Sequence, residues 1–379
     1  MFDYETIRFI WWVLLGILLI GFAVMDGFDL GVAILLPYVA RTDIERRIAI
    51  NTVGPVWEGN QVWLILGGGA IFAAWPTLYA TAFSGFYLAM FLALAALILR
   101  PVAFKFRSKI EHARWRAIWD AAIFVSGLVP ALIFGVAFGN VIVGVPFRFD
   151  DTMRMTYQGG LLGLLNPFAL VSGLISVGML TLHGASYLAL KASGPVVDRA
   201  VQIAPLAARV TIVLFLAAGI WVAFGIDGYV ITSQLAHDGP SNPLSKLVTR
   251  QAGAWLTNYR TFPWIIVAPV AAIVAQATTP ALLRAGRAGL GFIVSGVGIA
   301  SIIATAGLSI FPFMLPSSLD PRASLTVWDA SSSHFTLKIM LFATAVFLPL
   351  VLLYTAWVYR VLRGPVTAAF VESNGHSIY

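Results

Sequence analysis

Two aspartates lie inside the first long apolar stretch of the sequence. Asp26 and Asp29 are three positions apart and share one helix face. Gly27 and Gly31 beside them permit a kink or a local break. Because an ionisable side chain at membrane depth is costly, it indicates a function by default. The pair is predicted to handle protons or ions toward the cytoplasmic half of the membrane. Alternatively, the helix ends here and the aspartates begin a following cytoplasmic helix.

A third carboxylate stands at the start of the next apolar stretch. Glu58 and Gln61 lie on one helix face, and Asn60 adds an amide at the same level. Trp57 and Trp63 flank this group. A carboxylate among amides at a helix entrance can take up a proton and pass it inward if it is buried. Glu58 and Gln61 are therefore predicted to belong to a proton pathway. The alternative is that Glu58 only complements the positive N-terminus of its helix.

The sequence offers few residues for metal or haem chemistry. It contains no cysteine, which excludes disulfides, thiolate metal sites and a nucleophilic thiol. Of its five histidines, only His183 falls in a predicted span, and the others are His112, His237, His334 and His376. Haem is most often held by His or Met, and a metal site needs several converging ligands. No metal site is predicted, and His183 is interpreted as a hydrogen-bonded or cavity-facing histidine.

The elements that position these residues are helices in a lipid bilayer. The chain has 379 residues, of which 59% are hydrophobic and 11% are charged, whereas a soluble domain carries about 25% charged residues. We expect an all-α membrane protein with a single integral-membrane domain over 1–379. At about 20 apolar residues a span, the sequence predicts nine transmembrane helices, at 9–39, 57–75, 78–99, 117–139, 161–189, 206–226, 263–283, 288–313 and 335–359.

Details of these spans predict some of their neighbours. The second and third spans are separated by almost no loop at Pro76, so they are expected to be antiparallel neighbours. A run of three glycines at 67–69 in the second span predicts close packing against another helix or a bulky neighbour.

The distribution of Lys and Arg predicts the orientation of the bundle. Of the 24 such residues, 16 fall on the side shared by the C-terminus and alternate loops, and 8 fall on the other side. The larger group includes Arg100, assigned to the loop after the third span. Because cytoplasmic loops retain basic residues, the N-terminus is predicted outside and the C-terminus in the cytoplasm. The net charge of +7 is thus a topology signal, and no nucleic-acid partner is predicted.

Several longer motifs, taken together and in order, resemble subunit II of the bacterial cytochrome bd quinol oxidase, and the likeness runs along the whole chain. They are Phe9-Ile10-Trp11-Trp12 leading to Asp26-Gly27-Phe28-Asp29, Trp57-Glu58-Gly59-Asn60-Gln61-Val62-Trp63, Phe83-Ser84-Gly85-Phe86-Tyr87, Phe311-Pro312-Phe313 with Pro316-Ser317-Ser318, and Ser324-Leu325-Thr326-Val327-Trp328-Asp329-Ala330.

The resemblance implies a complex of the bacterial inner membrane that oxidises quinol and reduces oxygen to water in aerobic respiration. It contributes to the proton gradient without pumping. In that family, haem b, haem d and the quinol-oxidising loop belong to subunit I, which pairs with a nine-helix subunit II. A small single-span subunit often accompanies the pair. One member of the family carries a structural quinone in subunit II. The shortage of membrane histidines fits this division of labour.

Position by position, the resemblance implies roles for four of the residues above. Glu58 matches the family's acid implicated in proton delivery toward the haems, a position where relatives can have Asp. Trp63 matches a tryptophan near the proposed oxygen route. Asp26 and Asp29 match an acidic pair with a proton or structural role. A cofactor-binding residue in this chain is not identified.

Two other functions are open from the sequence. A secondary transporter would use the broken first span and its carboxylates to bind a coupling ion. A purely structural subunit would support assembly of the complex, and its carboxylates would affect haem content rather than turnover.

Overall fold

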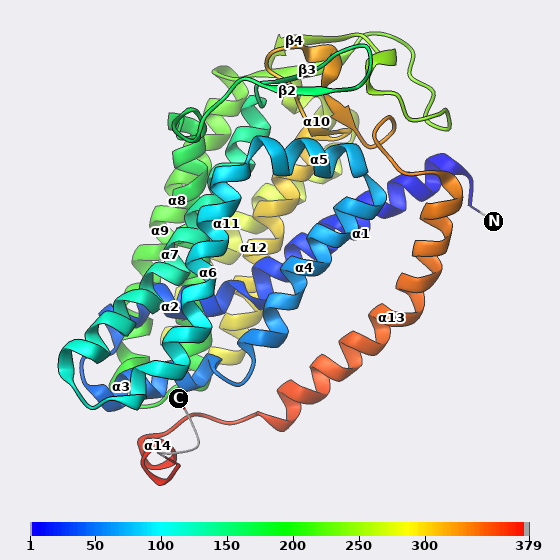
Figure 1. Cartoon of the computed structure of the whole chain (residues 1–379). Helices are drawn as coiled ribbons and strands as arrows, with labels where there is room; N and C mark the ends of the chain where they lie inside the picture. Colours follow the sequence, from blue (N-terminus) through cyan, green and yellow to red (C-terminus); the bar gives the residue numbers. More distant parts are fainter. Residues whose placement is uncertain (1, 375–378) are drawn as a thin grey trace.

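The computed structural model describes residues 2–374 and residue 379. In this part of the chain, eight segments are long and apolar enough to cross a membrane. The expected all-α membrane fold is confirmed (Figure 1). The helices of these segments are α1 (Tyr4–Met25) with α2 (Gly27–Val39), α6 (Tyr87–Phe106), α7 (Ala113–Val143), α8 (Pro167–Lys191), α9 (Pro195–Phe224), α11 (Val267–Arg284), α12 (Ala288–Ile310) and α13 (His334–Val361).

A further helix, α4 (Trp57–Ala74), occupies the place of the second expected span. It has 18 residues, begins with the polar group around Glu58 and is not among the eight candidate spans. It runs along α1 (Figure 1). Nine spans therefore stay a prediction.

Short elements fill the two ends of the bundle. They are α3 (Asp43–Val53), α5 (Pro76–Gly85), α10 (Thr257–Thr261) and α14 (Ala368–Ser373), the 3₁₀ turns Arg107–Lys109, Leu161–Leu164, Pro243–Ser245, Ala254–Leu256, Pro263–Ile266 and Pro321–Ala323, and six strands. The strands pair as antiparallel hairpins: β1 (Phe147–Phe149) with β2 (Met155–Tyr157), β3 (Asp227–Ile231) with β4 (Val248–Ala252), and β5 (Phe313–Leu315) with β6 (Leu325–Thr326).

The loops separate into two groups, as alternating spans require. The hairpins and α10 lie at one end of the bundle, called here the hairpin end, while α3 and α14 lie at the other end (Figure 1). Hydrogen bonds join segments far apart in sequence within each end, such as Val366 to Lys191 and Val145 to Pro316. Which end faces the cytoplasm stays a prediction from the basic residues.

The second and third expected spans are not joined by a tight hairpin, because a separate helix, α5, connects α4 to α6. After the turn at Trp75, α5 runs across the hairpin end and carries the chain from α4 to α6, which lies on the other side of it (Figure 1). Pro76 is the first residue of α5, where its missing N–H breaks no helical hydrogen bond. The tight turn therefore begins a crosspiece rather than a hairpin of spans.

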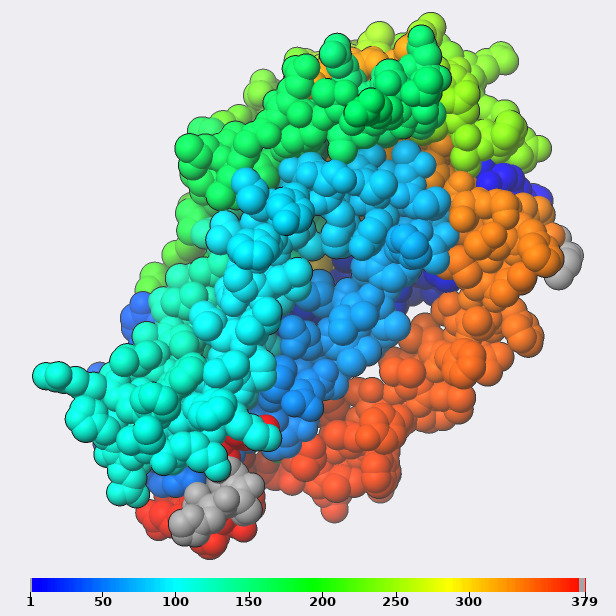
Figure 2. All heavy atoms as spheres, in the orientation of Figure 1, coloured from blue at the N-terminus to red at the C-terminus, as the bar shows by residue number. Residues whose placement is uncertain are grey.

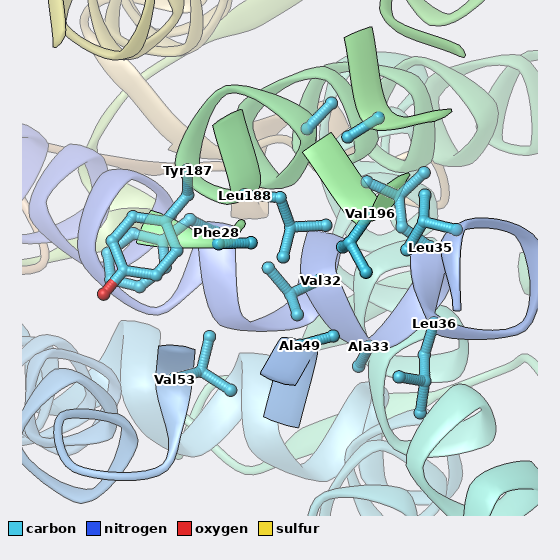
Figure 3. Packing of buried hydrophobic residues seen from close by; sticks show 14 of the residues in the cluster. Phe28, Val32, Ala33, Leu35, Leu36, Ala49, Val53, Tyr187, Leu188 and Val196 are labelled. Atoms are coloured by element: carbon cyan, nitrogen blue, oxygen red, sulfur yellow. The ribbon is translucent and has the colours of Figure 1, made fainter. Parts of the chain in front are cut away.

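The short helix α2 forms the centre of one core. Its apolar side chains are buried all around, including Phe28, Val32 and Leu36, as expected for a helix surrounded by others. Figure 3 shows them packed against Val53 of α3 and Leu188 of α8. A helix does end at Met25, as the alternative prediction has it, but the helix that follows is buried in this core and Asp26 makes no side-chain capping hydrogen bond.

Glycines allow α2 to approach its neighbours closely. A β-carbon on Gly31 would lie 2.0 Å from the backbone oxygen of Leu180 and 2.9 Å from the α-carbon of Gly184, both on α8. Backbone atoms cannot move aside as a flexible side chain can. The contact between α2 and α8 therefore requires glycine at position 31.

We expect Gly31→Ala to destabilise the protein by about 1–3 kcal/mol, the usual effect of overpacking. The midpoint of thermal unfolding of the purified protein measures this. Gly219→Ala on α9 is the matched control, because a β-carbon there meets no atom within 4 Å. Equal midpoints for the two variants would contradict the close contact of α2 with α8.

Outside the spans, Glu45 ties α3 to α9. Its carboxylate accepts hydrogen bonds from Arg199, at 2.8 Å, and from the backbone N–H groups of Arg41 and Thr42. The Arg199 hydrogen bond, helped by these backbone donors, lowers the pKa of Glu45 to about 2 from its ordinary 4.5. The ionised carboxylate is thus favoured in the folded state.

Because the pKa is lower when folded, the stabilisation by Glu45 is complete above about pH 4.5 and is lost as the pH falls toward 2. We expect Glu45→Gln to lower the unfolding midpoint at pH 7, and the difference from wild type to shrink between pH 4.5 and 2. The exposed Glu372→Gln is the control. A difference that does not depend on pH would contradict this role.

Candidate functional site

A buried ion pair lies at the break in the first apolar stretch. Asp26 stands between the last residue of α1 and the first of α2, and its side chain makes no capping hydrogen bond. Its carboxylate pairs with Arg100 of α6 at 2.7 Å, and the two side chains are 0% and 1% exposed. Both carboxylate oxygens accept from the guanidinium. Arg100 is therefore not a loop residue, and its earlier assignment to the loop after the third span is wrong.

Asp29, one turn further along α2, belongs to a second set of hydrogen bonds. One carboxylate oxygen accepts from the side-chain amide of Asn60 on α4 at 2.8 Å. The amide oxygen of Asn60 accepts from the hydroxyl of Tyr359 on α13 at 2.7 Å. Asn60 of α4 donates one of these bonds and accepts the other, so it links α4 to α2 and to α13. We call Asp26, Asp29, Asn60, Arg100 and Tyr359 the buried aspartate cluster.

The second carboxylate oxygen of Asp29 has unused capacity. Oδ1 is buried and has no hydrogen-bond partner in the described residues. A cavity of about 10 Å³ is lined by Asp29 and by apolar side chains that include Val53 and Phe104. This volume is about what one water molecule needs. The site can therefore hold a proton or a water at a carboxylate that no cation contacts directly.

Glu58 and Gln61 lie apart from this cluster. Glu58 is exposed in the first turn of α4, and Gln61 is half-buried. Neither side chain has a hydrogen-bond or ion-pair partner among the described residues. Asn60, which lies between them in the sequence, is buried. The side chains of this motif therefore lie on two different faces of α4. The structure brings Asp29 and Asn60 together and leaves Glu58 on the surface of the chain.

The surface around Glu58 continues along α4 as an exposed stripe at helical spacing. We call it the open face of α4: Glu58, Val62, Ile65, Gly69 and Phe72. A β-carbon on Gly69 would meet no atom of this chain within 4 Å. Gly67 of the same run is buried, and a β-carbon there would lie 3.9 Å from Leu19 of α1, an ordinary contact distance. Among the described residues, the glycine run therefore shows no approach that would exclude a β-carbon.

The flanking tryptophans are both buried. Trp57 is 6% exposed and meets Phe104 edge to face, with ring centroids 5.9 Å apart. Trp63 is 7% exposed and packs on Gly21 of α1, where a β-carbon would lie 2.5 Å from its ring. Trp63 thus fills the contact between α1 and α4.

His183 is hydrogen-bonded and buried, as predicted. Its Nδ1 lies 2.7 Å from Ser295 Oγ and its Nε2 lies 2.9 Å from the carbonyl oxygen of Val24. The ring stacks on Phe292 with centroids 4.6 Å apart. Both ring nitrogens are occupied, so the site does not fit an iron atom. His376 lies outside the described residues.

Two members of the buried aspartate cluster were missed by sequence reasoning. Arg100 closes an apolar run at membrane depth, and this position, where a charge demands a partner, was a usable signal. Tyr359 lies in an ordinary apolar span beside other aromatic residues, and nothing in its spacing marks it.

Breaking the Asp26–Arg100 pair tests the cluster directly. Removing one partner of a buried pair leaves an uncompensated charge and costs about 3–5 kcal/mol. We expect Arg100→Gln or Asp26→Asn alone to lose most of the folded protein, and Asp26→Asn with Arg100→Gln to recover much of it. Yield after extraction in mild detergent and thermal unfolding measure this. If the double variant loses as much stability as the two single losses summed, the residues are not coupled.

Comparisons with known proteins identify the family. A family model described as cytochrome bd terminal oxidase subunit II matches residues 7–362. Over the full length of both chains, the protein is 51% identical to cytochrome bd-I ubiquinol oxidase subunit 2 of Escherichia coli K12 and 48% identical to a probable cytochrome oxidase subunit 2 of Haemophilus influenzae.

A more distant relative and a solved structure agree. The chain is 31% identical to cytochrome bd ubiquinol oxidase subunit 2 of Bacillus subtilis, over 93% of this chain and 95% of the relative. Its fold matches a chain of the bd oxidase structure from Geobacillus thermodenitrificans with a TM-score of 0.69 and 18% identity, covering 94% of this chain and 98% of the other. The chain therefore belongs to the family of cytochrome bd terminal oxidase subunit II.

Proposed function

We propose that this chain ligates no haem itself and that it supplies helices and proton-carrying groups to a haem-bearing subunit I. Family membership makes it a multi-pass subunit of a haem-containing quinol oxidase in the bacterial inner membrane. One observation supports the division of labour: both nitrogens of His183, the histidine within a predicted span, are already hydrogen-bonded.

The observation that carries the proposal is an exposed carboxylate on α4, the helix in the place of the second expected span. Glu58 has no partner in the described part of this chain, and a lone charge would be costly there where α4 crosses the membrane as predicted. A partner subunit that covers the open face of α4 removes this cost. We therefore place subunit I against α4, where Glu58 lies at the boundary between the subunits.

Helix α13 supports the same placement. It lies at the edge of the molecule beyond α4 (Figures 1 and 2). Leu337 is its only buried residue, and Tyr359 ties its far end to Asn60. Phe335, Phe342 and Phe347 of α13 are more than half exposed. An apolar helix with so little burial in its own chain suits an intersubunit surface. The small single-span subunit is also proposed, without an assigned surface.

At that boundary, Glu58 can take up a proton and pass it toward subunit I, with Gln61 on the same side of the helix as a hydrogen-bonding neighbour. We propose Asp29 as a second proton-holding group, because its oxygen Oδ1 has no hydrogen-bond partner in the described residues and Asp29 lines a cavity of about one water. The role proposed for Asp26 is to pair with Arg100 and so to hold this part of the site in place.

Further family features remain proposals for the complex. Haem b, haem d and the quinol-oxidising loop belong to subunit I, and quinol donates the electrons that reduce oxygen to water. Trp63, which fills the contact between α1 and α4, borders the route of oxygen. A structural quinone has no assigned residue in this chain. The transporter alternative finds no support in the comparisons.

Glu58→Gln tests the proton role. We expect oxygen consumption by the assembled complex to fall roughly tenfold or more, because a positioned proton donor contributes at least this much. Glu58→Asp retains a titratable group and should keep most of the activity, and the exposed Glu111→Gln is a charge-matched control. The haem spectrum is recorded for each variant.

The same variants separate the proposal from a purely structural role. Reduced turnover with a full haem spectrum supports proton delivery. Unchanged oxygen consumption and proton uptake in Glu58→Gln would show that the relay assignment is wrong. Loss of haem in proportion to loss of activity would favour an assembly role.

A further inference from the structure

A cavity lies at the hairpin end, far from the buried aspartate cluster. Its volume is about 530 Å³. It lies where α7 ends, α8 begins and α9 ends, and the loop after β2 and strand β4 also contribute to its walls. Helices α8 and α9 lie on the side of the bundle away from α13 (Figure 1). The cavity is therefore separate from the face proposed for subunit I.

The cavity walls are apolar and aromatic with one positive charge. Arg250 is the only charged residue among those that line it. Its guanidinium lies 5.7 Å from the ring of Tyr229 and forms no ion pair in the described residues. Since the walls hold a cation and no carboxylate, they complement an anion.

Neutral hydrogen-bond donors accompany this charge. Trp221 and the exposed residue Gln158 are among the lining residues, and the indole nitrogen of the first and the side-chain amide of the second have no hydrogen-bond partner in the described residues. Asn166 also lines it, and its amide donates to Asn140 while its oxygen caps α8. An oxyanion in the cavity would find an arginine and two unused donors.

The position of the cavity indicates whether such an anion would reach it from water or from the lipid. Trp221 is 39% exposed although it lies inside a membrane span, and Phe168 packs edge to face against it. Next to the cavity, the surface of α9 is strongly apolar, with Phe224 87% exposed and Ile220 63% exposed. Tryptophan favours the boundary between hydrocarbon and headgroups. The cavity thus opens at the level where lipid headgroups meet acyl chains.

We propose that this cavity binds the headgroup of an anionic phospholipid, with the phosphate at Arg250 and the acyl chains along the exposed surface of α9. A soluble anion would satisfy the arginine but not the apolar surface that continues from it. A neutral apolar ligand would make no use of the arginine, which is exposed and would stay in contact with solvent. An anionic lipid satisfies both.

Native mass spectrometry of the purified, delipidated oxidase complex tests the site by titration with dioleoyl phosphatidylglycerol. We expect Arg250→Gln to weaken the tightest binding step about fivefold, because one basic residue near an anionic surface contributes about 1 kcal/mol. Arg148→Gln is the matched control, since Arg148 is exposed on β1 at the same end and lies outside the cavity.

A second variant tests the shape of the site with the charge intact. A β-carbon on Gly163 meets no atom within 4 Å, and Gly163 lines the cavity. Gly163→Phe should therefore fill part of it and abolish the tightest step. Gly160→Phe is the control, because it has the same open surroundings but is not among the lining residues.

Two ligand comparisons identify the chemistry. Dioleoyl phosphatidylcholine, which carries no net charge, should bind several-fold more weakly than phosphatidylglycerol. Excess inorganic phosphate should not displace the bound lipid. Wild-type affinity in both Arg250→Gln and Gly163→Phe would overturn the proposal. Equal binding of the two lipids, or displacement by phosphate alone, would do so as well.

Discussion

The pairing of Asp26 with Arg100 is the interaction on which the interior of this protein depends. A charge at membrane depth needs a partner, and here each charge is the other's only ion-pair partner in the described residues. The pair lies where α1 ends, so it fixes where the chain departs from a single long helix. Because Arg100 belongs to α6, the pair also joins α6 to the end of α1. Asp29 then follows one turn later on α2, where Asn60 and Tyr359 extend the polar contacts to α4 and α13.

The same rule appears at the hairpin end. Lys246 pairs with Asp329 at 2.7 Å, and both side chains are almost fully buried. Arg8 is 0% exposed and donates to Ser331 and to the carbonyls of His237 and Gly239. Buried charges in this protein thus have partners, usually from distant parts of the sequence. Glu58 differs because it is exposed on α4 without a partner among the described residues, which is the physical reason to propose another subunit there.

The sequence was enough to predict the helical membrane class, most span boundaries and the break near Asp26, because hydropathy and glycine are local signals. It also identified Asp29, Asn60 and His183 as polar groups within spans. The hydrogen-bond and ion-pair partners of these buried groups were harder to predict from the sequence. Arg100 resembled a loop base because it lies beside other basic residues, and Tyr359 resembled its aromatic neighbours. The crosspiece α5 was missed because its composition does not distinguish it from the start of a span. Pairing between distant helices depends on packing that no local pattern records.

The central claim is that subunit I covers the open face of α4 and meets Glu58 there. Because the chain contains no cysteine, a single cysteine can be placed at Ile65 on that face, or at Val213 on α9 as a control that is similarly exposed. Cysteine-directed photo-crosslinking in membranes that contain the whole oxidase is the most direct measurement. We expect Ile65→Cys to link this chain to subunit I and Val213→Cys not to do so. Linkage from Val213→Cys alone would contradict this claim.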